Sequence, residues 1–192
     1  MAELLTIIAT SSTCFTGRSW YCWICCITYI SVEHPSVTYL DTNYIPFAAL
    51  TTKRYGRQNP VYYVGFNFST TVPMDNNIVC EFYFYEFLSN VYKRSFVQII
   101  RKFCDLLEND IFFGPAIKQQ ECFKGPCPFP PNNFVLVNMS IPPTSIPPSF
   151  PFKKGRILLN MTMAKRTIAS GYIDMEIREL KKKDDKITFS KI

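Results

Sequence analysis

Residues 103–134 read FCDLLENDIFFGPAIKQQECFKGPCPFPPNNF and hold three of the chain's eight cysteines, Cys104, Cys122 and Cys127. The stretch begins at the end of a predicted helix and finishes among prolines, which exclude a helix and restrict strand pairing. A helix end tied by cysteines to a Pro-rich loop forms a rigid frame. The fold therefore depends on what the strands on either side of this frame enclose.

Length and composition favour one folded domain. The chain has 192 residues, of which 47% are apolar and 16% aromatic, so it can build a hydrophobic core and does not resemble a disordered chain. The net charge of +6 comes mostly from scattered basic residues. The one basic cluster, residues 181–183, lies beside two aspartates. We therefore predict no nucleic-acid partner and a charged C-terminal tail over residues 181–192.

The N-terminal segment is typical of a secretory signal. After Arg18 runs WYCWICCITYI, a mostly apolar stretch that is shorter than the roughly 20 residues of a bilayer span and has the length of a signal core. Glu3 in place of a basic cluster, and no small-residue cleavage motif near Ser31, depart from the usual signal pattern. The prediction is a signal segment over residues 1–31 and a folded domain over residues 32–180.

Four cysteines remain outside this segment, an even number that suits two disulfides in an oxidising compartment. Three pairings of them are possible. Three Asn-x-Ser/Thr sequons, at Asn67, Asn138 and Asn160, add acceptor sites for glycosylation. Signal, cysteines and sequons together predict a secreted, extracellular glycoprotein.

Alternating strands are predicted on both sides of the opening stretch. An outward Asn67 and an outward Glu81 turn the intervening apolar side chains to one face, as does an outward Asn160. Residues 134–141 break this rule, because Asn138 shares the parity of Phe134 and Leu136. Either both faces of that strand are covered or that sequon is unused. The inward residues are Tyr62, Val64, Phe66, Phe68, Ile78, Cys80, Phe82, Phe84, Ile157, Leu159, Met161, Met163, Ile173, Met175 and Ile177.

In residues 95–109 the spacing of the apolar residues differs from the alternation of the strands. Apolar residues recur there at steps of three and four, Ser95 can cap the first turn and Asn109 can end the last, so the spacing predicts a helix. Sequential strands with one short helix and no alternation of strand and helix indicate an all-β, mainly antiparallel fold with two sheets. The architecture expected is a β-sandwich or β-cup.

The sequence offers little material for catalysis, and we predict a protein that is not an enzyme. His34 is the only histidine, so Ser/His, Cys/His and multi-histidine metal sites lack their components. The pairs Asp174 with Glu176 and Asp105 with Glu108 are interpreted as solvated surface. The CxxC spacing from Cys22 to Cys25 has no second ligand pair. No catalytic residue, metal site or cofactor is predicted.

The excess of inward phenylalanine, tyrosine and methionine has two interpretations. These side chains either fill a closed core or line an apolar cavity between sheets that do not meet, where methionine adapts to variable hydrocarbon shapes. Composition alone does not separate the two.

Four motifs carry a family resemblance. They are residues 103–107 (FCDLL), Cys122 with residues 127–130 (CPFP), residues 146–158 (IPPSF followed by KGRIL) and residues 170–177 (SGYIDMEI). In order and spacing, the chain resembles the ganglioside-activator branch of the lipid-recognition (ML) domain family, most closely its insect secreted and chemosensory members. The resemblance covers residues 62–180. The final strand carries Gly171-Tyr172 where the vertebrate activators have Gly-Cys.

The resemblance implies a lipid-recognition β-cup without a cofactor. It also implies a disulfide between Cys104 and Cys127, which leaves Cys80 to pair with Cys122. The expected function is that of a secreted carrier holding a lipid, hydrocarbon or pheromone-like ligand for transport or presentation, with a membrane surface or receptor receiving it. The alternative is a closed-core interaction sandwich or receptor accessory.

The ligand is expected to enter near residues 111–113 and 150–152, where residues 111–115 would form a movable apolar lip. The residues expected to contact it are Phe66, Phe68, Phe82, Phe84, Met161, Met163 and Met175 on the wall, with Phe112 and Phe113 at the rim.

Overall fold

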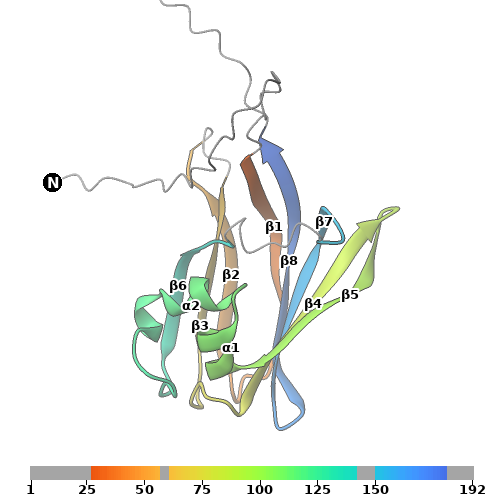
Figure 1. The fold of residues 1–192 in the computed structure, drawn as a ribbon. Helices are drawn as coiled ribbons and strands as arrows, with labels where there is room; N and C mark the ends of the chain where they lie inside the picture. The colour runs from red at the N-terminus through yellow and green to blue at the C-terminus, as the bar shows by residue number, and fades with distance from the viewer. Residues whose placement is uncertain (1–26, 57–60, 142–149, 181–192) are drawn as a thin grey trace, which may run out of the picture.

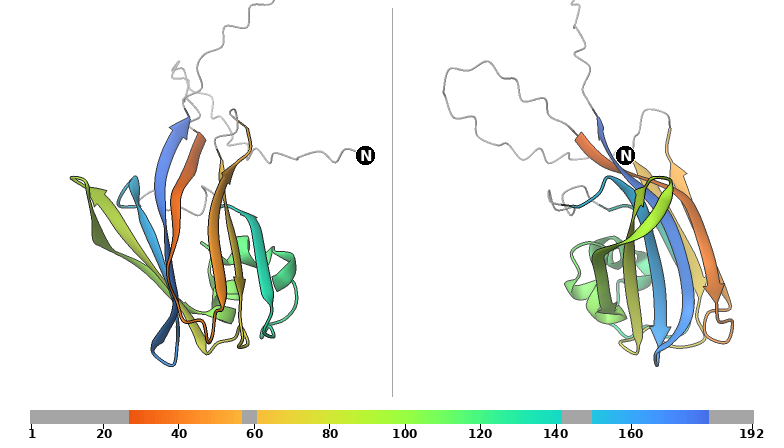
Figure 2. Two further views of the ribbon diagram at one scale, coloured as in Figure 1. Left: turned by 180° about the vertical axis from the view of Figure 1, so that it is seen from behind. Right: turned by 90° about the vertical axis from the view of Figure 1, so that its right-hand side faces the viewer.

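The computed structural model describes residues 27–56, 61–141 and 150–180. These residues form two antiparallel sheets that face each other, with short helical elements joining them on one side (Figures 1 and 2). The larger sheet has the order β1-β8-β7-β4-β5 and the smaller has the order β2-β3-β6. The strands are β1 (Ile27–Leu40), β2 (Phe47–Arg54), β3 (Tyr62–Ser69), β4 (Ile78–Leu88), β5 (Val91–Lys102), β6 (Asn133–Met139), β7 (Lys154–Met163) and β8 (Arg166–Leu180). The helical elements are α1 (Phe103–Asn109), α2 (Gly114–Lys118) and the 3-10 turn η1 (Glu121–Phe123).

The all-β, two-sheet prediction is confirmed, and so is the alternation on which it rests. In β4, Ile78, Cys80, Phe82 and Phe84 are buried while the residues between them are partly exposed. In β3, Asn67 is exposed beside buried Phe68. A period of two places every second side chain on one face, so these strands turn their apolar residues toward the facing sheet.

The helix predicted over residues 95–109 is wrong in its first half. Residues up to Lys102 belong to β5, which pairs with β4 through Ile99 opposite Phe82, and only Phe103–Asn109 is helical. A register shift between Tyr83 and Tyr85 adds residues to β5, and this bulge gives the apolar side chains a helix-like spacing. The Ser95 hydroxyl accepts the Val97 N–H at 3.2 Å, a turn within the bulge in place of a helix cap.

The exception at Asn138 has a backbone cause that neither sequence alternative included. Asn138 has a φ of 54°, and the register of β6 on β3 shifts between Phe66 and Val64. Asn138 is therefore an additional residue in a β-bulge, which shifts the alternation of β6 by one position. As a result Asn138 is exposed and Met139 turns inward. Its side-chain oxygen accepts the Tyr55 hydroxyl at 2.7 Å.

The folded domain begins earlier than predicted. β1 starts at Ile27, opposite Leu180 of β8, so residues 27–31 belong to the sheet although they were assigned to the signal segment. Their alternating apolar residues, with Ile30 buried, serve the strand as well as they would a signal core. The remainder of that segment and the tail over residues 181–192 lie outside the described residues.

The β1–β2, β3–β4 and β7–β8 connections lie at the lower end of the molecule in Figure 1. Residues in or beside these connections are almost completely buried: Ile45, Met74, Ile78 and Ile168. Asp41, in the β1–β2 connection, anchors this end because its N–H donates to the Ile168 carbonyl at 2.8 Å and its carbonyl accepts two N–H groups of the turn. The two sheets are therefore joined firmly at one end.

One of the two expected disulfides is present. Cys104 and Cys127 are bonded, with their Cα atoms 5.8 Å apart, and this confirms the first pairing. The second pairing, Cys80 with Cys122, is wrong, since both are free thiols. Cys80 faces the gap between the sheets from β4, whereas Cys122 lies on η1 with its sulfur 3.9 Å from the Val135 carbonyl oxygen of β6.

We expect the double substitution Cys104→Ala/Cys127→Ala to lower the free energy of unfolding by about 3 kcal/mol, because the bond closes a loop with a sequence separation of 23 residues. Urea denaturation followed by circular dichroism measures this loss. The control is Cys122→Ala, which removes a half-buried free thiol and should cost much less. Equal losses in the two proteins would contradict the assigned bond.

Candidate ligand-binding cavity

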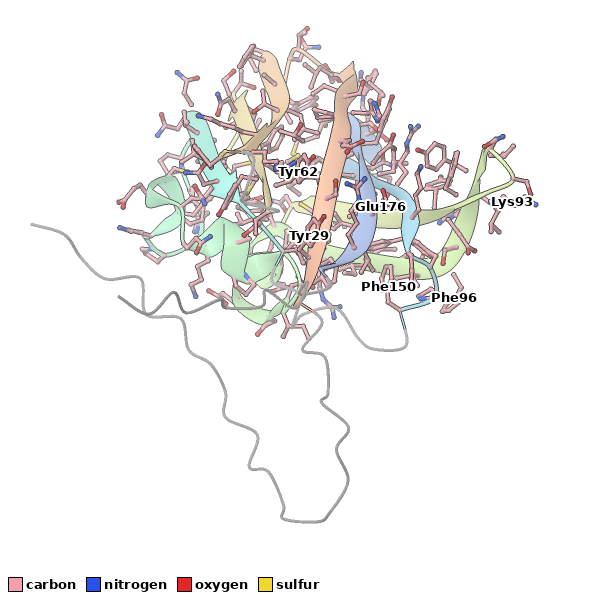
Figure 3. The ribbon with its side chains drawn as sticks, turned by 90° about the horizontal axis from the view of Figure 1, so that it is seen from above. Tyr29, Tyr62, Lys93, Phe96, Phe150 and Glu176 are labelled. Carbon is pink, nitrogen blue, oxygen red and sulfur yellow. A yellow bond between two sulfur atoms is a disulfide. The ribbon has the colours of Figure 1, made fainter. Side chains whose placement is uncertain are left out.

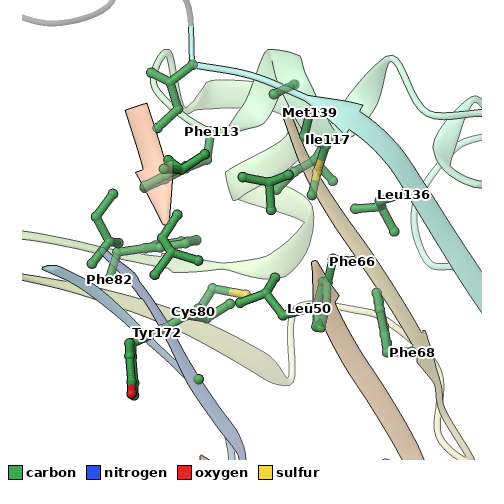
Figure 4. Close-up of a pocket in the computed structure, with 18 of the residues that line it drawn as sticks. Leu50, Phe66, Phe68, Cys80, Phe82, Phe113, Ile117, Leu136, Met139 and Tyr172 are labelled. Carbon is green, nitrogen blue, oxygen red and sulfur yellow. The ribbon is translucent and has the colours of Figure 1, made fainter. Parts of the chain in front are cut away.

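A cavity of about 400 Å³ lies between the two sheets. Side chains from both sheets and from α1 and α2 converge on it, as Figure 4 shows for Leu50, Phe66, Phe82 and Ile117. Its volume falls within the range of about 300 to 1,000 Å³ that is usual for small-molecule sites. The inward aromatic residues therefore do not fill the space between the sheets.

The sheets stay apart because helical elements separate them on one side. Along the other side the sheets approach directly, where β1 contacts β2 and β3. On the helical side, α1 contacts β4 and β5, while α2 and η1 contact β6. Phe123 stacks on Phe134 of β6 at 5.0 Å and packs edge-on against Phe103 of α1 at 5.5 Å. This aromatic wedge fixes the width of the gap, and the Cys104–Cys127 bond ties α1 to the loop beyond η1.

Five of the nine residues expected to contact ligand line this cavity: Phe66, Phe68, Phe82, Phe113 and Met161. Phe66 and Phe68 stack on each other at 4.7 Å, and Phe113 stacks on Phe82 at 4.0 Å. These residues come from β3, β4, β7 and the loop before α2.

The other four expected contacts lie outside the lining. Phe84, 1% exposed, packs with Phe112 and Phe150 in an aromatic cluster that adjoins the cavity through Phe113. Met163 lies at the tightly packed end, opposite Ile78, and Met175 is only 2% exposed and opposite Gly155. Strand parity identified the inward face correctly for Phe84 and Met175, whereas Phe112 lies in a loop, where strand parity does not apply. It did not show how far along the strand the cavity extends.

Several lining residues were not among the predicted contacts. Tyr62, Val64, Ile157, Leu159 and Ile173 share the inward parity of residues that were chosen, so the strand pattern could have included them. Leu50 and Ala48 of β2 carry no comparable signal, because the charged residues of β2, Lys53 and Arg54, are adjacent at its end and therefore do not mark one face as outward. Met139 was hidden by the bulge at Asn138.

The loop over residues 110–114, which includes most of the lip expected over residues 111–115, is stabilised by hydrogen bonds to one side chain. The Asp110 carboxylate accepts the N–H groups of Phe112, Phe113 and Gly114. A side chain at Gly114 would meet the Leu106 carbonyl oxygen at 2.5 Å, so the chain passes close to α1 there. Of this loop only Ile111 is strongly exposed, at 78%. The buried Phe112 and Phe152 close the side where entry was expected.

The end of the cavity away from the tightly packed connections is the less buried one. Tyr29 of β1 and Tyr62 of β3 line it and are only half-buried, as are Val61 and Ile141. Figure 3 looks down on this end and shows Tyr29 and Tyr62 on the two facing sheets.

No ionisable carboxylate, amine, guanidinium or imidazole lines the cavity within the described part of the chain. The Cys80 thiol does line it, and burial raises its pKa to about 12. The thiol is therefore neutral at physiological pH and unsuited to act as a nucleophile. No cluster of three or more potential metal ligands occurs among the described residues.

The carboxylate of Asp174, interpreted from sequence as solvated, is largely buried in an ion pair on the outer face. The Arg156 guanidinium donates to it at 2.7 Å and 3.3 Å, and also lies over the rings of Tyr172 and Tyr92 at 3.7 Å and 4.1 Å. His34 Nδ1 lies 3.3 Å from Asp174. This network joins β5, β7 and β8 and stabilises the larger sheet, and its Tyr172 also lines the cavity.

Comparison with family models and with curated proteins found no match to this sequence. Within the described residues, no helix has the length and apolar character needed to cross a membrane.

The two free thiols should differ in reactivity. At pH 8 we expect a maleimide to label Cys122, which is half-buried, and to leave Cys80 unlabelled until the protein is unfolded in urea. Peptide mapping by mass spectrometry distinguishes the two sites. In the unfolded chain the Cys80 thiol has a pKa near 9, whereas burial raises its pKa to about 12 in the folded protein. The contribution of neutral Cys80 to the free energy of unfolding is therefore fully present below pH 9 and declines as the pH rises toward 12. Rapid labelling of Cys80 in the folded protein would contradict its burial.

Two alanine substitutions should separate the cavity from the packed core. Phe84→Ala removes a fully packed ring and should cost about 3 to 5 kcal/mol. Phe66→Ala removes a half-buried ring that borders existing space, so its cost should be clearly smaller. Denaturant titration of both variants provides the comparison, and a larger loss for Phe66→Ala would show that no cavity separates the sheets.

Proposed function

We propose that this protein binds a lipid, long-chain hydrocarbon or similar apolar ligand non-covalently between its sheets, for transport or presentation. The observation that carries the proposal is a cavity of about 400 Å³ whose lining has no charged side chain among the described residues. A charged group moved into such surroundings would lose its hydration without gaining a partner. The cavity therefore selects hydrocarbon and leaves a polar head group at the Tyr29 and Tyr62 end.

The energy available from burial is sufficient for useful affinity. Each buried CH₂ contributes about 0.8 kcal/mol, so a chain of about twelve such groups gains on the order of 10 kcal/mol before ordering costs. No polar anchor is needed to reach that figure. Binding by this route involves no covalent step, in line with a carrier and not an enzyme.

Two further observations support a secreted carrier of the kind that the family resemblance implies. The Cys104–Cys127 bond suits an oxidising compartment. The side chains of Asn67 and Asn138 are exposed and accessible to glycosylation, whereas Asn160 is half-buried and accepts the Ser170 hydroxyl at 2.7 Å. A membrane surface or receptor that receives the ligand remains part of the proposal.

A pair of adjacent alanines offers a matched test. Ala48 of β2 lines the cavity, whereas Ala49 stands opposite the outward Asn67 and does not. We expect Ala48→Trp to weaken uptake of the neutral fluorescent probe N-phenyl-1-naphthylamine at least tenfold, because the indole fills the space. Ala49→Trp should leave uptake unchanged.

Native mass spectrometry of the secreted protein, before and after solvent extraction, provides an independent check. We expect an apolar adduct that extraction removes. Probe uptake unaffected by Ala48→Trp, together with the absence of any exchangeable hydrocarbon, would favour the closed-core interaction module instead.

A further inference from the structure

β5 is an edge strand with an unusual charge pattern. Among the described residues it pairs only with β4, and its outer side has no neighbouring strand. It carries Lys93, Arg94, Arg101 and Lys102 and no acidic residue. The hairpin of β4 and β5 stands out from the body of the larger sheet, with Lys93 near its tip (Figures 1 and 3). A long, accessible strand edge of one charge is thus presented to solvent.

Three of these basic residues have no carboxylate partner within the described part of the chain. None of its ion pairs includes Lys93, Arg101 or Lys102. Arg94 differs, since its guanidinium lies 4.3 Å from the centre of the Tyr83 ring and donates to the Gln98 side chain. Positive charge at both ends of β5 is therefore free to meet a partner.

Apolar side chains lie between these two charged ends. Phe96, on the bulge, is 85% exposed, the highest value of any large apolar residue in the described chain, and Ile100 is also exposed. An exposed phenylalanine on a strand edge is costly to keep in water, and it provides a contact for a partner side chain.

Strand β6, at an edge of the smaller sheet, is covered by helical elements, whereas β5, at an edge of the larger sheet, is not. The Val137 N–H of β6 donates to the Gln120 side chain at 2.9 Å, and the Val135 carbonyl faces the Cys122 sulfur. The helical elements thus occupy backbone groups that a partner strand would need. Within β5 as described, only the Val97 N–H is occupied by a side chain, the Ser95 hydroxyl at the bulge.

The same charge pattern argues against pairing of two copies. If two β5 strands paired antiparallel about the midpoint between Val97 and Gln98, Lys93 would face Lys102 and Arg94 would face Arg101. Like charges directly opposite each other destabilise a sheet. A partner strand with acidic residues at both ends would instead place opposite charges at each of these positions.

We propose that β5 is a docking edge for an extended, acidic segment of another protein, which adds to the larger sheet as a further antiparallel strand. Backbone hydrogen bonds supply the pairing, the basic ends of β5 select the acidic residues, and Phe96 contacts the apolar centre of the segment. The site lies outside the cavity, so a carrier could bind ligand and protein partner together.

The test uses the full chain and two synthetic ten-residue peptides that alternate Val and Thr and end in pairs of either glutamates or lysines. We expect only the glutamate peptide to bind in fluorescence anisotropy and to slow hydrogen exchange of the β5 amides. Arg101→Glu/Lys102→Glu should weaken this binding at least tenfold and increase affinity for the lysine peptide. The control, Lys118→Glu/Lys165→Glu, changes the same charge on exposed residues away from β5 and should have little effect.

Three results would overturn the proposal. Equal weakening by the control variant would reduce the effect to general charge attraction. Equal binding of a glutamate peptide with a central proline would exclude strand addition, because proline cannot donate to the ladder. Binding of phosphatidylserine vesicles through Arg101 and Lys102, without peptide binding, would make the edge a membrane contact instead.

Discussion

The packing of Phe123 between Phe103 and Phe134 is the contact on which the rest of the structure depends. These rings place α1 and η1 against the smaller sheet, while α1 also contacts β4 and β5 of the larger one. Two sheets with apolar inner faces would otherwise close to about 10 Å and exclude the space between them. The Cys104–Cys127 bond holds the wedge in place, and the cavity is its direct consequence.

Keeping that space open has an energetic cost. Residues that border open space lose packing contacts that a filled core would provide. The packed end around Met74 and Ile168, the disulfide and the Arg156–Asp174 network offset part of this cost. A hydrocarbon in the cavity would restore the missing contacts, so ligand binding and stability are coupled.

The sequence predicts the strands far better than it predicts the cavity. A period of two is a local property, and one outward residue such as Asn67 or Glu81 orients a whole strand. The first half of the helix predicted over residues 95–109 is wrong because a β-bulge imitates helical spacing. The parity of β6 was misread because the positive φ of Asn138 shifts the alternation by one residue.

The extent of the cavity is a tertiary property. Phe84 has the same parity as Phe82 on β4, and Met175 has the same parity as Ile173 on β8. Contacts from other elements, such as those of Phe112 and Phe150 with Phe84, decide which inward residues face open space. The pairing of Cys80 and Cys122 failed for a similar reason, since an even count of cysteines does not bring two of them together.

The most direct test of the central claim is an intermolecular NOE experiment with methyl-labelled protein and an unlabelled sixteen-carbon alcohol. The account predicts contacts from the ligand's methylene chain to the methyl groups of Leu50, Met139 and Leu159, and none to Met175 or Ile168. Contacts confined to exposed Ile111, or spread over the surface, would contradict a binding site between the sheets.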